Sequence, residues 1–195
     1  MASINGITVK ALKSFRGHEG EHLCQGNVYL GNKKIGWWSQ NSHGGCDHIY
    51  LDEPYRVDKL SEKVKELNHD KVKTYSHNDG SQFTVEYSLD LLFGDLMVLI
   101  DDEAAFKKAV IDGYTGILLV TDGHTVFGWN LRASLTNMSN MEIIEYLAKD
   151  IEEGKKQHGF YKEDKFIKHK IKIYRSLDDF NIGEKINLTE IKGGK

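Results

Sequence analysis

Two histidines lie four residues apart in the segment GHEGEH at residues 17–22, and a glutamate follows the first of them. In zinc metalloproteases this His-Glu-x-x-His pattern lies on a helix, where residues i and i+4 share a face and both imidazoles reach one metal ion. Here Gly20 lies between the histidines and Gly17 precedes them. Glycine inside a helix costs about 1 kcal/mol, and no apolar periodicity extends on either side. We therefore expect a turn between two strands rather than a metalloprotease helix.

Two cysteine–histidine pairs near this turn form a second candidate metal site. The pairs His22-x-Cys24 and Cys46-x-His48 have the spacing that directs both side chains to one face of a strand. If the two strands pair, the four residues supply the nitrogen and sulfur ligands of a tetrahedral zinc site. The spacing matches no familiar zinc finger or ribbon, and a chain of 195 residues does not need a metal to fold. We favour the alternative of no cofactor, with two buried cysteines that pack as small apolar side chains.

An acidic run at Asp101, Asp102 and Glu103 follows two further aspartates, Asp90 and Asp95. Carboxylates arranged around a divalent metal ion are the catalytic centre of many nucleases. The ordinary alternative is that acidic residues near a helix N-terminus complement the helix dipole. We favour this alternative, and we keep residues 101–103 as a candidate surface for docking a charged partner.

A basic segment lies near the end of the chain. Residues 155–175 contain seven lysines and one arginine against Glu163 and Asp164. Lysines that share one face of a strand can follow a phosphate backbone, but they also protect an edge strand from aggregation or simply face solvent. The candidate binding residues of this segment are Lys165, Lys168, Lys170, Lys172 and Arg175.

Adjacent tryptophans, Trp37 and Trp38, lie in a segment with strand character. Successive side chains of a strand point to opposite faces. We therefore expect one indole in the core and the other at the surface, where an exposed tryptophan is a typical anchor of a binding interface.

The elements that position these side chains follow from the apolar pattern. Residues 1–53 show strands at 7–15, 22–30, 34–40 and 46–51 separated by glycine-containing turns, which indicates an antiparallel β meander. Residues 54–195 show helical spacing at 57–67, two helical pieces within 88–112, and a helix after the capping box of Ser139 and Glu142. Hairpins are expected around 76–81 and 122–123, and a late strand at 166–175. Because regular βαβ units are lacking, we predict an α+β fold, with 1–53 and 54–195 as two regions or one compact domain.

The composition excludes several classes of protein. There are 26 basic and 29 acidic residues, a net charge of −3, so no global charge favours nucleic acid or a membrane. Two cysteines do not make a secreted disulfide framework. No apolar run approaches the roughly 18 residues that span a bilayer, and the N-terminus lacks the apolar core of a signal peptide. We expect a cytoplasmic protein without a membrane partner.

One segment carries a resemblance to known proteins. The run SFRGHEGEHLCQGNVYLGNKKIGWWSQNSHGGC at residues 14–46 resembles an N-terminal segment of small uncharacterised proteins of bacteriophages and mobile elements. The likeness lies in the order of a Phe-Arg-Gly-His-Glu-Gly run, a Gln-Gly strand, a Gly-Asn-Lys-Lys hairpin and a Gly-Gly turn. It carries no established active site, so it transfers no residue role. It implies an accessory protein that acts on host machinery, for example as an inhibitor of a CRISPR effector, in the cytoplasm of a bacterial host.

The sequence thus leads to two hypotheses from different classes. The first is a non-enzymatic protein that binds and occludes a host protein or ribonucleoprotein, with contact to the nucleic-acid backbone. The second is a metal-dependent hydrolase or nuclease that uses the His/Cys residues or the carboxylates of residues 101–103.

Overall fold

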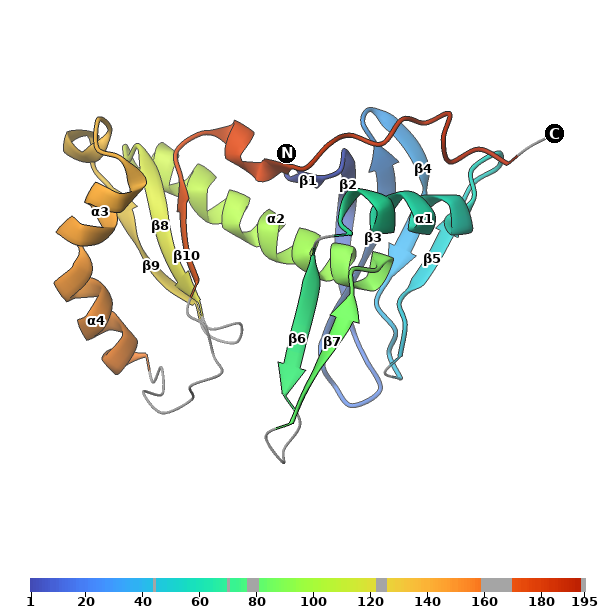
Figure 1. The fold of residues 1–195 in the computed structure, drawn as a ribbon, viewed down its shortest axis with the longest axis horizontal. Helices are drawn as coiled ribbons and strands as arrows, with labels where there is room; N and C mark the ends of the chain where they lie inside the picture. The colour runs from blue at the N-terminus through green and yellow to red at the C-terminus, as the bar shows by residue number, and fades with distance from the viewer. Residues whose placement is uncertain (44, 70, 77–80, 122–125, 159–169, 194–195) are drawn as a thin grey trace. The chain divides into compact units, whose positions relative to one another are not determined.

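The computed structural model describes residues 1–43, 45–69, 71–76, 81–121, 126–158 and 170–193. It confirms the α+β class and the N-terminal antiparallel meander (Figure 1). By contacts the chain divides into unit 1, residues 1–100 and 180–195, and unit 2, residues 101–179. The sequence left open whether residues 1–53 and 54–195 are two regions or one compact domain. The meander does not stand apart from the residues after it, because helices that follow it in sequence cover one of its faces.

Unit 1 is built on a curled six-stranded sheet. The strand order is β11 (Asn181–Ile182), β1 (Ser3–Ile4), β2 (Ile7–Arg16), β3 (His22–Leu30), β4 (Lys33–Ser39) and β5 (His48–Leu51). The pair β1–β11 is parallel and the other pairs are antiparallel. Each of the strands β2 to β5 pairs with its neighbour in sequence, which is what short turns between alternating strands dictate.

Two helices pack on one face of this sheet. Helix α1 (Val57–Leu67) buries Leu60 and Val64, and the N-terminal part of α2 (Leu89–Ile111) buries Leu92, Phe93 and Leu96. Figure 1 shows α1 lying across the strands. The sheet residues of this core are Ile7, Val9, Val28, Leu30, Ile35, Trp38 and Leu51. The strands β6 (Val72–Ser76) and β7 (Gln82–Glu86) form the predicted hairpin, whose tip lies outside the described residues.

Helix α2 differs from the expectation of two pieces within residues 88–112. It is a single helix of 23 residues, and the acidic run at 101–103 lies inside it. The helix continues through the run, and the ion pair of Glu103 with Lys107, four residues apart, supports it there.

Unit 2 contains a three-stranded antiparallel sheet with the order β10 (Lys170–Tyr174), β8 (Gly116–Thr121) and β9 (Val126–Leu131). Helices α3 (Asn140–Tyr146) and α4 (Ala148–Gln157) pack on it, and the short helices η1 (Ala133–Leu135) and η2 (Leu177–Phe180) complete the chain order. The predicted capping box is present, since Ser139 Oγ accepts from Glu142 N and Glu142 Oε2 accepts from Ser139 N. The core residues are Leu118, Val120, Phe127, Leu131, Ile143, Leu147 and Ile151.

The predicted strand at 166–175 is described from Lys170 onward. Two candidate binding residues, Lys165 and Lys168, lie outside the described residues. Among the helices that the structure describes, none combines the length and the apolar character needed to cross a bilayer.

Candidate functional site

The sheet of unit 1 has a core face and an open face, and the strand register shows which residues lie on each. Val9, Val28, Gly36 and Leu51 are paired across β2 to β5 and are buried. The neighbouring row of paired residues is Lys10, Asn27, Trp37 and Tyr50. Residues directly opposite each other in a sheet share a face, and successive residues alternate. The second row therefore lies on the face that the helices leave open.

Two aromatic side chains dominate this open face. Trp37 is 43% exposed and Tyr50 is 55% exposed. Their ring centroids lie 6.5 Å apart and their planes are inclined by 26°, so the rings are stacked. An indole and a phenol that remain this exposed on regular strands provide a flat apolar surface with a polar edge.

The adjacent indole of Trp38 lies on the core face and is fully buried. It stacks on Phe93 with centroids 5.2 Å apart, and its Nε1–H donates to Asp47 Oδ2 at 2.7 Å. The prediction that the two tryptophans divide between core and surface is confirmed. As a binding residue Trp38 is excluded, because a fully buried side chain with its donor satisfied offers nothing to a partner.

The open face is also basic. Strands β2 to β5 contain neither Asp nor Glu. Of their five cationic residues, Lys10, Lys13 and Lys34 pair with Asn27, Gln25 and Tyr29 on the open face, whereas Arg16 and Lys33 pair with His22 and Leu30 in the rows of the other face. Lys10 Nζ lies 4.3 Å from the centre of the Tyr29 ring, on the same face as Trp37. In a chain with a net charge of −3, this segregation creates a local positive field that the totals conceal.

A bulge in β2 shapes the surface beside Trp37. Lys10 pairs with Asn27 and Lys13 pairs with Gln25, so Ala11 and Leu12 together oppose Gly26. Ala11 has φ 53°, a conformation that residues with a Cβ rarely adopt. Gly26 makes the bulge feasible, since a Cβ there would collide with Val9 Cγ1 and lie 3.0 Å from Lys10 O.

A hollow of about 290 Å³ lies next to the bulge. It is lined by Ala11, Lys13, Gln25, Asn27 and Trp37, together with Gly26 and Trp38. Within the described part of the chain, the side-chain amides of Gln25 and Asn27 make no hydrogen bond. The hollow therefore combines an aromatic wall, a cation and two amides whose donors and acceptors remain available.

A larger hollow of about 820 Å³ adjoins the other end of this face. Thr8, Lys10, Lys33 and Lys185 contribute to its lining. The Thr8 hydroxyl is buried, and it has no hydrogen-bond partner among the residues that the structure describes. None of the three lysines forms an ion pair within those residues. The basic character of the open face thus extends from Lys13 to Lys185.

Two of the predicted acidic docking residues are not at the surface. Asp102 is 6% exposed and Glu103 is 4% exposed, whereas Asp101 is exposed. Asp102 Oδ2 accepts from Tyr174 Oη at 2.7 Å and from Lys172 Nζ at 2.8 Å, and Glu103 Oε1 lies 2.9 Å from Lys107 Nζ. Burial, followed by the hydrogen bond to Asp102, raises the pKa of Tyr174 above its ordinary range, so Tyr174 stays a donor. The prediction of a docking surface is therefore wrong for Asp102 and Glu103.

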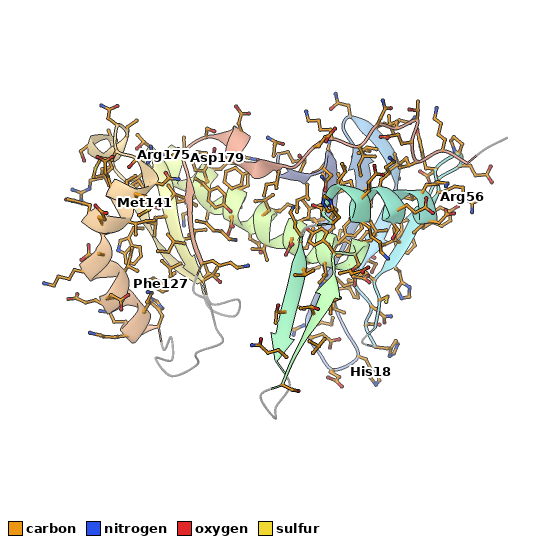
Figure 2. All side chains as sticks on the ribbon, in the orientation of Figure 1. His18, Arg56, Phe127, Met141, Arg175 and Asp179 are labelled. Carbon is orange, nitrogen blue, oxygen red and sulfur yellow. The ribbon has the colours of Figure 1, made fainter. Side chains whose placement is uncertain are left out.

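The described residues of the basic segment have separate roles. Lys172 is tied to Asp102, and Lys170 is exposed. Arg175 Nη2 donates to Met138 O at 2.6 Å, while Asp179 Oδ2 accepts from the backbone N–H of Arg175 at 2.6 Å. Figure 2 shows Arg175 and Asp179 side by side. Of the three described candidates, only Lys170 is free to meet a partner, since Lys172 and Arg175 hold unit 2 together.

The four His/Cys residues do not gather as the zinc hypothesis requires. His22 and Cys24 lie on β3, His48 lies on β5 and Cys46 just precedes it, and β4 separates these two strands. Across the described ranges, no three His, Cys, Asp or Glu residues are grouped so as to hold a metal ion. The expectation of two buried cysteines is also wrong, since Cys46 is exposed and Cys24 half-buried. A hydrogen bond with Asp90 is the main cause that raises the pKa of the Cys46 thiol.

The segment GHEGEH is a turn between β2 and β3, as predicted. Gly17 N donates to Glu21 O at 2.9 Å, and Gly20 adopts φ +82°, where glycine carries no steric penalty. Figure 2 shows His18 at the far end of this loop. The His18 ring meets His43 of the β4–β5 loop at a centroid distance of 5.3 Å.

No protein-family model, curated protein or solved structure matches this chain.

Proposed function

We propose that the chain is a non-enzymatic binding protein whose partner occupies the open face of the sheet in unit 1. The observation that carries the proposal is the exposed, stacked pair of Trp37 and Tyr50 on paired strands. Burying such aromatic surface against a partner contributes strongly to binding, and tryptophan and tyrosine are enriched among the residues that dominate interfaces.

The strands hold this surface in a fixed geometry. Trp37 and Tyr50 are held in register by β4 and β5, and the opposite side of β4 is anchored by the buried Trp38. A surface that is rigid before binding loses little conformational entropy when a partner arrives. This favours recognition by a preformed face over recognition by a loop that orders on contact.

The more specific form of the proposal is an accessory protein of a phage or mobile element that occludes a host protein or ribonucleoprotein, such as a CRISPR effector or another defence nuclease. The support for this form is the resemblance of residues 14–46, which include Gln25, Asn27 and Trp37 of the open face. The protein would act by covering a surface of its target in the bacterial cytoplasm.

Affinity capture from a bacterial lysate tests the proposal. The immobilised chain should retain a defined macromolecule that the double variant Trp37→Ala/Tyr50→Ala does not retain. Tyr146→Ala is the matched control, because Tyr146 is a 68% exposed aromatic residue of unit 2. Inhibition of the captured target should saturate at one chain per target, whereas an enzyme acts below that ratio. Equal capture by the chain and the double variant would contradict the proposal.

A further inference from the structure

We infer that the open face of unit 1 binds single-stranded nucleic acid, with bases stacked on Trp37 and Tyr50 and phosphates along the lysines of the same face. The inference rests on the proposed binding function and names the chemistry of the partner. Proteins that bind single strands without strict sequence preference combine a positive track for the backbone with aromatic platforms for the bases. Both features are present on this one face.

The charge distribution favours a polyanion as the occupant. Strands β2 to β5 carry no acidic residue, and three of their five cationic residues, Lys10, Lys13 and Lys34, lie on the open face, although the whole chain has more acidic than basic residues. Lys13 and Lys34 are exposed and form no ion pair within the described part of the chain. Their charges are therefore available to phosphates, whose neutralisation releases counterions and stabilises the complex.

The aromatic geometry favours unpaired bases. Trp37 and Tyr50 present two stacked rings on adjacent strands, with centroids 6.5 Å apart. Bases inside a duplex are covered by their neighbours in the stack, so only a single strand can lay its base faces on exposed rings. Among the described residues, the open face presents strands and no helix that could enter a major groove, the usual route to reading a duplex.

The length of the paired row on the open face suits a short single strand of nucleic acid. The row from Lys10 through Asn27 and Trp37 to Tyr50 crosses three strand spacings, about 14 Å in all. Lysine lies at one end of the row and the aromatic pair at the other. A single strand of nucleic acid that lies along this row can therefore place a phosphate against Lys10 and stack its bases on Trp37 and Tyr50.

Two side-chain amides beside Trp37 are available for further contacts with the nucleic acid. Gln25 and Asn27 border the hollow beside Trp37, and their side chains keep both donor and acceptor available. An amide can pair with the edge of a base or with a sugar hydroxyl.

The test is fluorescence anisotropy of the full chain with labelled 15-residue oligonucleotides of mixed sequence, as single-stranded DNA, single-stranded RNA and duplex DNA. We expect both single strands to bind at least tenfold more tightly than the duplex. With three phosphates neutralised, the slope of log K against log salt concentration should be about −2. A higher affinity for RNA than for DNA would assign a contact to the 2′-hydroxyl.

Variants locate the contact. Trp37→Ala and Tyr50→Ala should each weaken binding by about 5- to 150-fold, the range for loss of one base stack. Lys13→Ala/Lys34→Ala should make the salt slope shallower by about 1.4. Tyr146→Ala and Lys149→Ala, which alter exposed residues of unit 2, should leave both the affinity and the slope unchanged. Melting curves establish that each variant is folded.

The outcomes separate this inference from the proposed function. Failure to bind any oligonucleotide, together with lysate capture that depends on Trp37 and Tyr50, would overturn the inference and leave the proposed function standing, with a protein as the occupant. Oligonucleotide binding that survives Trp37→Ala and Tyr50→Ala would overturn the inference by placing the contact elsewhere. If the unaltered chain neither captures a macromolecule from the lysate nor binds any oligonucleotide, both proposals are overturned.

Discussion

Tyr174 donates its hydroxyl hydrogen to the carboxylate of Asp102 at 2.7 Å, and the same carboxylate oxygen accepts from Lys172 at 2.8 Å. Helix α2 supplies the acceptor, and strand β10 supplies both donors. The carboxylate is 6% exposed, so its charge is stabilised by these partners rather than by water. The pair therefore holds β10 against the first residues of unit 2.

Asp102→Asn should destabilise unit 2 by about 1–3 kcal/mol, because Lys172 loses its counter-charge while Tyr174 keeps an acceptor. Hydrogen exchange at the amides of β8 and β10 measures this loss within unit 2. The matched control is Asp101→Asn, an exposed neighbour that should change stability by less than about 0.5 kcal/mol. Equal protection in the two variants would show that the buried contact contributes nothing.

The ion pair of Lys172 with Asp102 determines which lysine of the basic segment can be mutated without unfolding unit 2. Lys172→Glu would place a second carboxylate against Asp102, so we expect loss of folded unit 2 rather than a selective loss of binding. Lys170→Glu reverses a charge on the exposed neighbour and should leave the melting temperature within about 2 °C of the original. A binding defect in Lys170→Glu with unchanged melting would assign this surface a role of its own.

The features that sequence predicted are those encoded locally. The meander follows from alternating residues and glycine-containing turns, and the capping box needs only Ser139 and Glu142. The opposite placement of Trp37 and Trp38 follows from the two-residue period of a strand. Each of these depends on neighbours within a few residues, where local preference and tertiary structure agree.

The features that sequence missed depend on residues far apart in the chain. Lys172 and Tyr174 lie 70 and 72 residues after Asp102, so no local pattern shows that this carboxylate is buried. The spacing of the two Cys/His pairs suggested that they could meet at one metal ion, because the spacing does not show that strand β4 lies between β3 and β5. The basic open face was hidden by a net charge of −3, and the bulge at Ala11 carries no glycine that would signal a positive φ.

Ser139→Ala should destabilise unit 2 by about 1 kcal/mol, because the hydroxyl accepts from the backbone N–H of Glu142 at the start of α3. Ser139→Asp should retain most of the stability, since aspartate is an equally good cap that also suits the helix dipole. Urea unfolding followed by Trp129 fluorescence, in a background with both Trp37 and Trp38 replaced by Phe, reports unit 2. Equal destabilisation by alanine and aspartate would mean that the cap itself is not the cause.

Asp47→Asn should stabilise unit 1 at pH 7 by less than about 1 kcal/mol, a value kept small because the carboxylate is partly solvated. Burial raises the pKa of Asp47 above 3.8, against the opposing hydrogen bond from Trp38, and the charge of Asp90 raises it further. The folded state thus binds this proton more tightly than the unfolded state. Stability is greatest with Asp47 protonated and is lost as the pH rises through the folded pKa.

Melting temperatures of the Asp47→Asn variant and the unaltered chain, taken from pH 3 to pH 7, check this sign. The difference should vanish at pH 3 and favour the variant at pH 7, while the amide oxygen of the new side chain still accepts from Trp38. Glu142→Gln is a control of opposite sign, since the backbone hydrogen bond from Ser139 lowers the pKa of Glu142. The contribution of Glu142 is present above pH 4.5 and is lost as the pH falls through its folded pKa.

Ala11→Gly should stabilise unit 1 by up to about 1 kcal/mol, because Ala11 has φ 53° and glycine adopts this conformation without a Cβ clash. Gly26→Ala should destabilise the unit by about 1–3 kcal/mol, since the new methyl group would collide with Val9 and with the backbone of Lys10. Chemical denaturation of the two variants measures both effects. Backbone strain is retained mainly where function depends on it, so Ala11→Gly should also weaken binding at the hollow beside Trp37. A variant with higher stability and unchanged affinity would show that the bulge serves the fold alone.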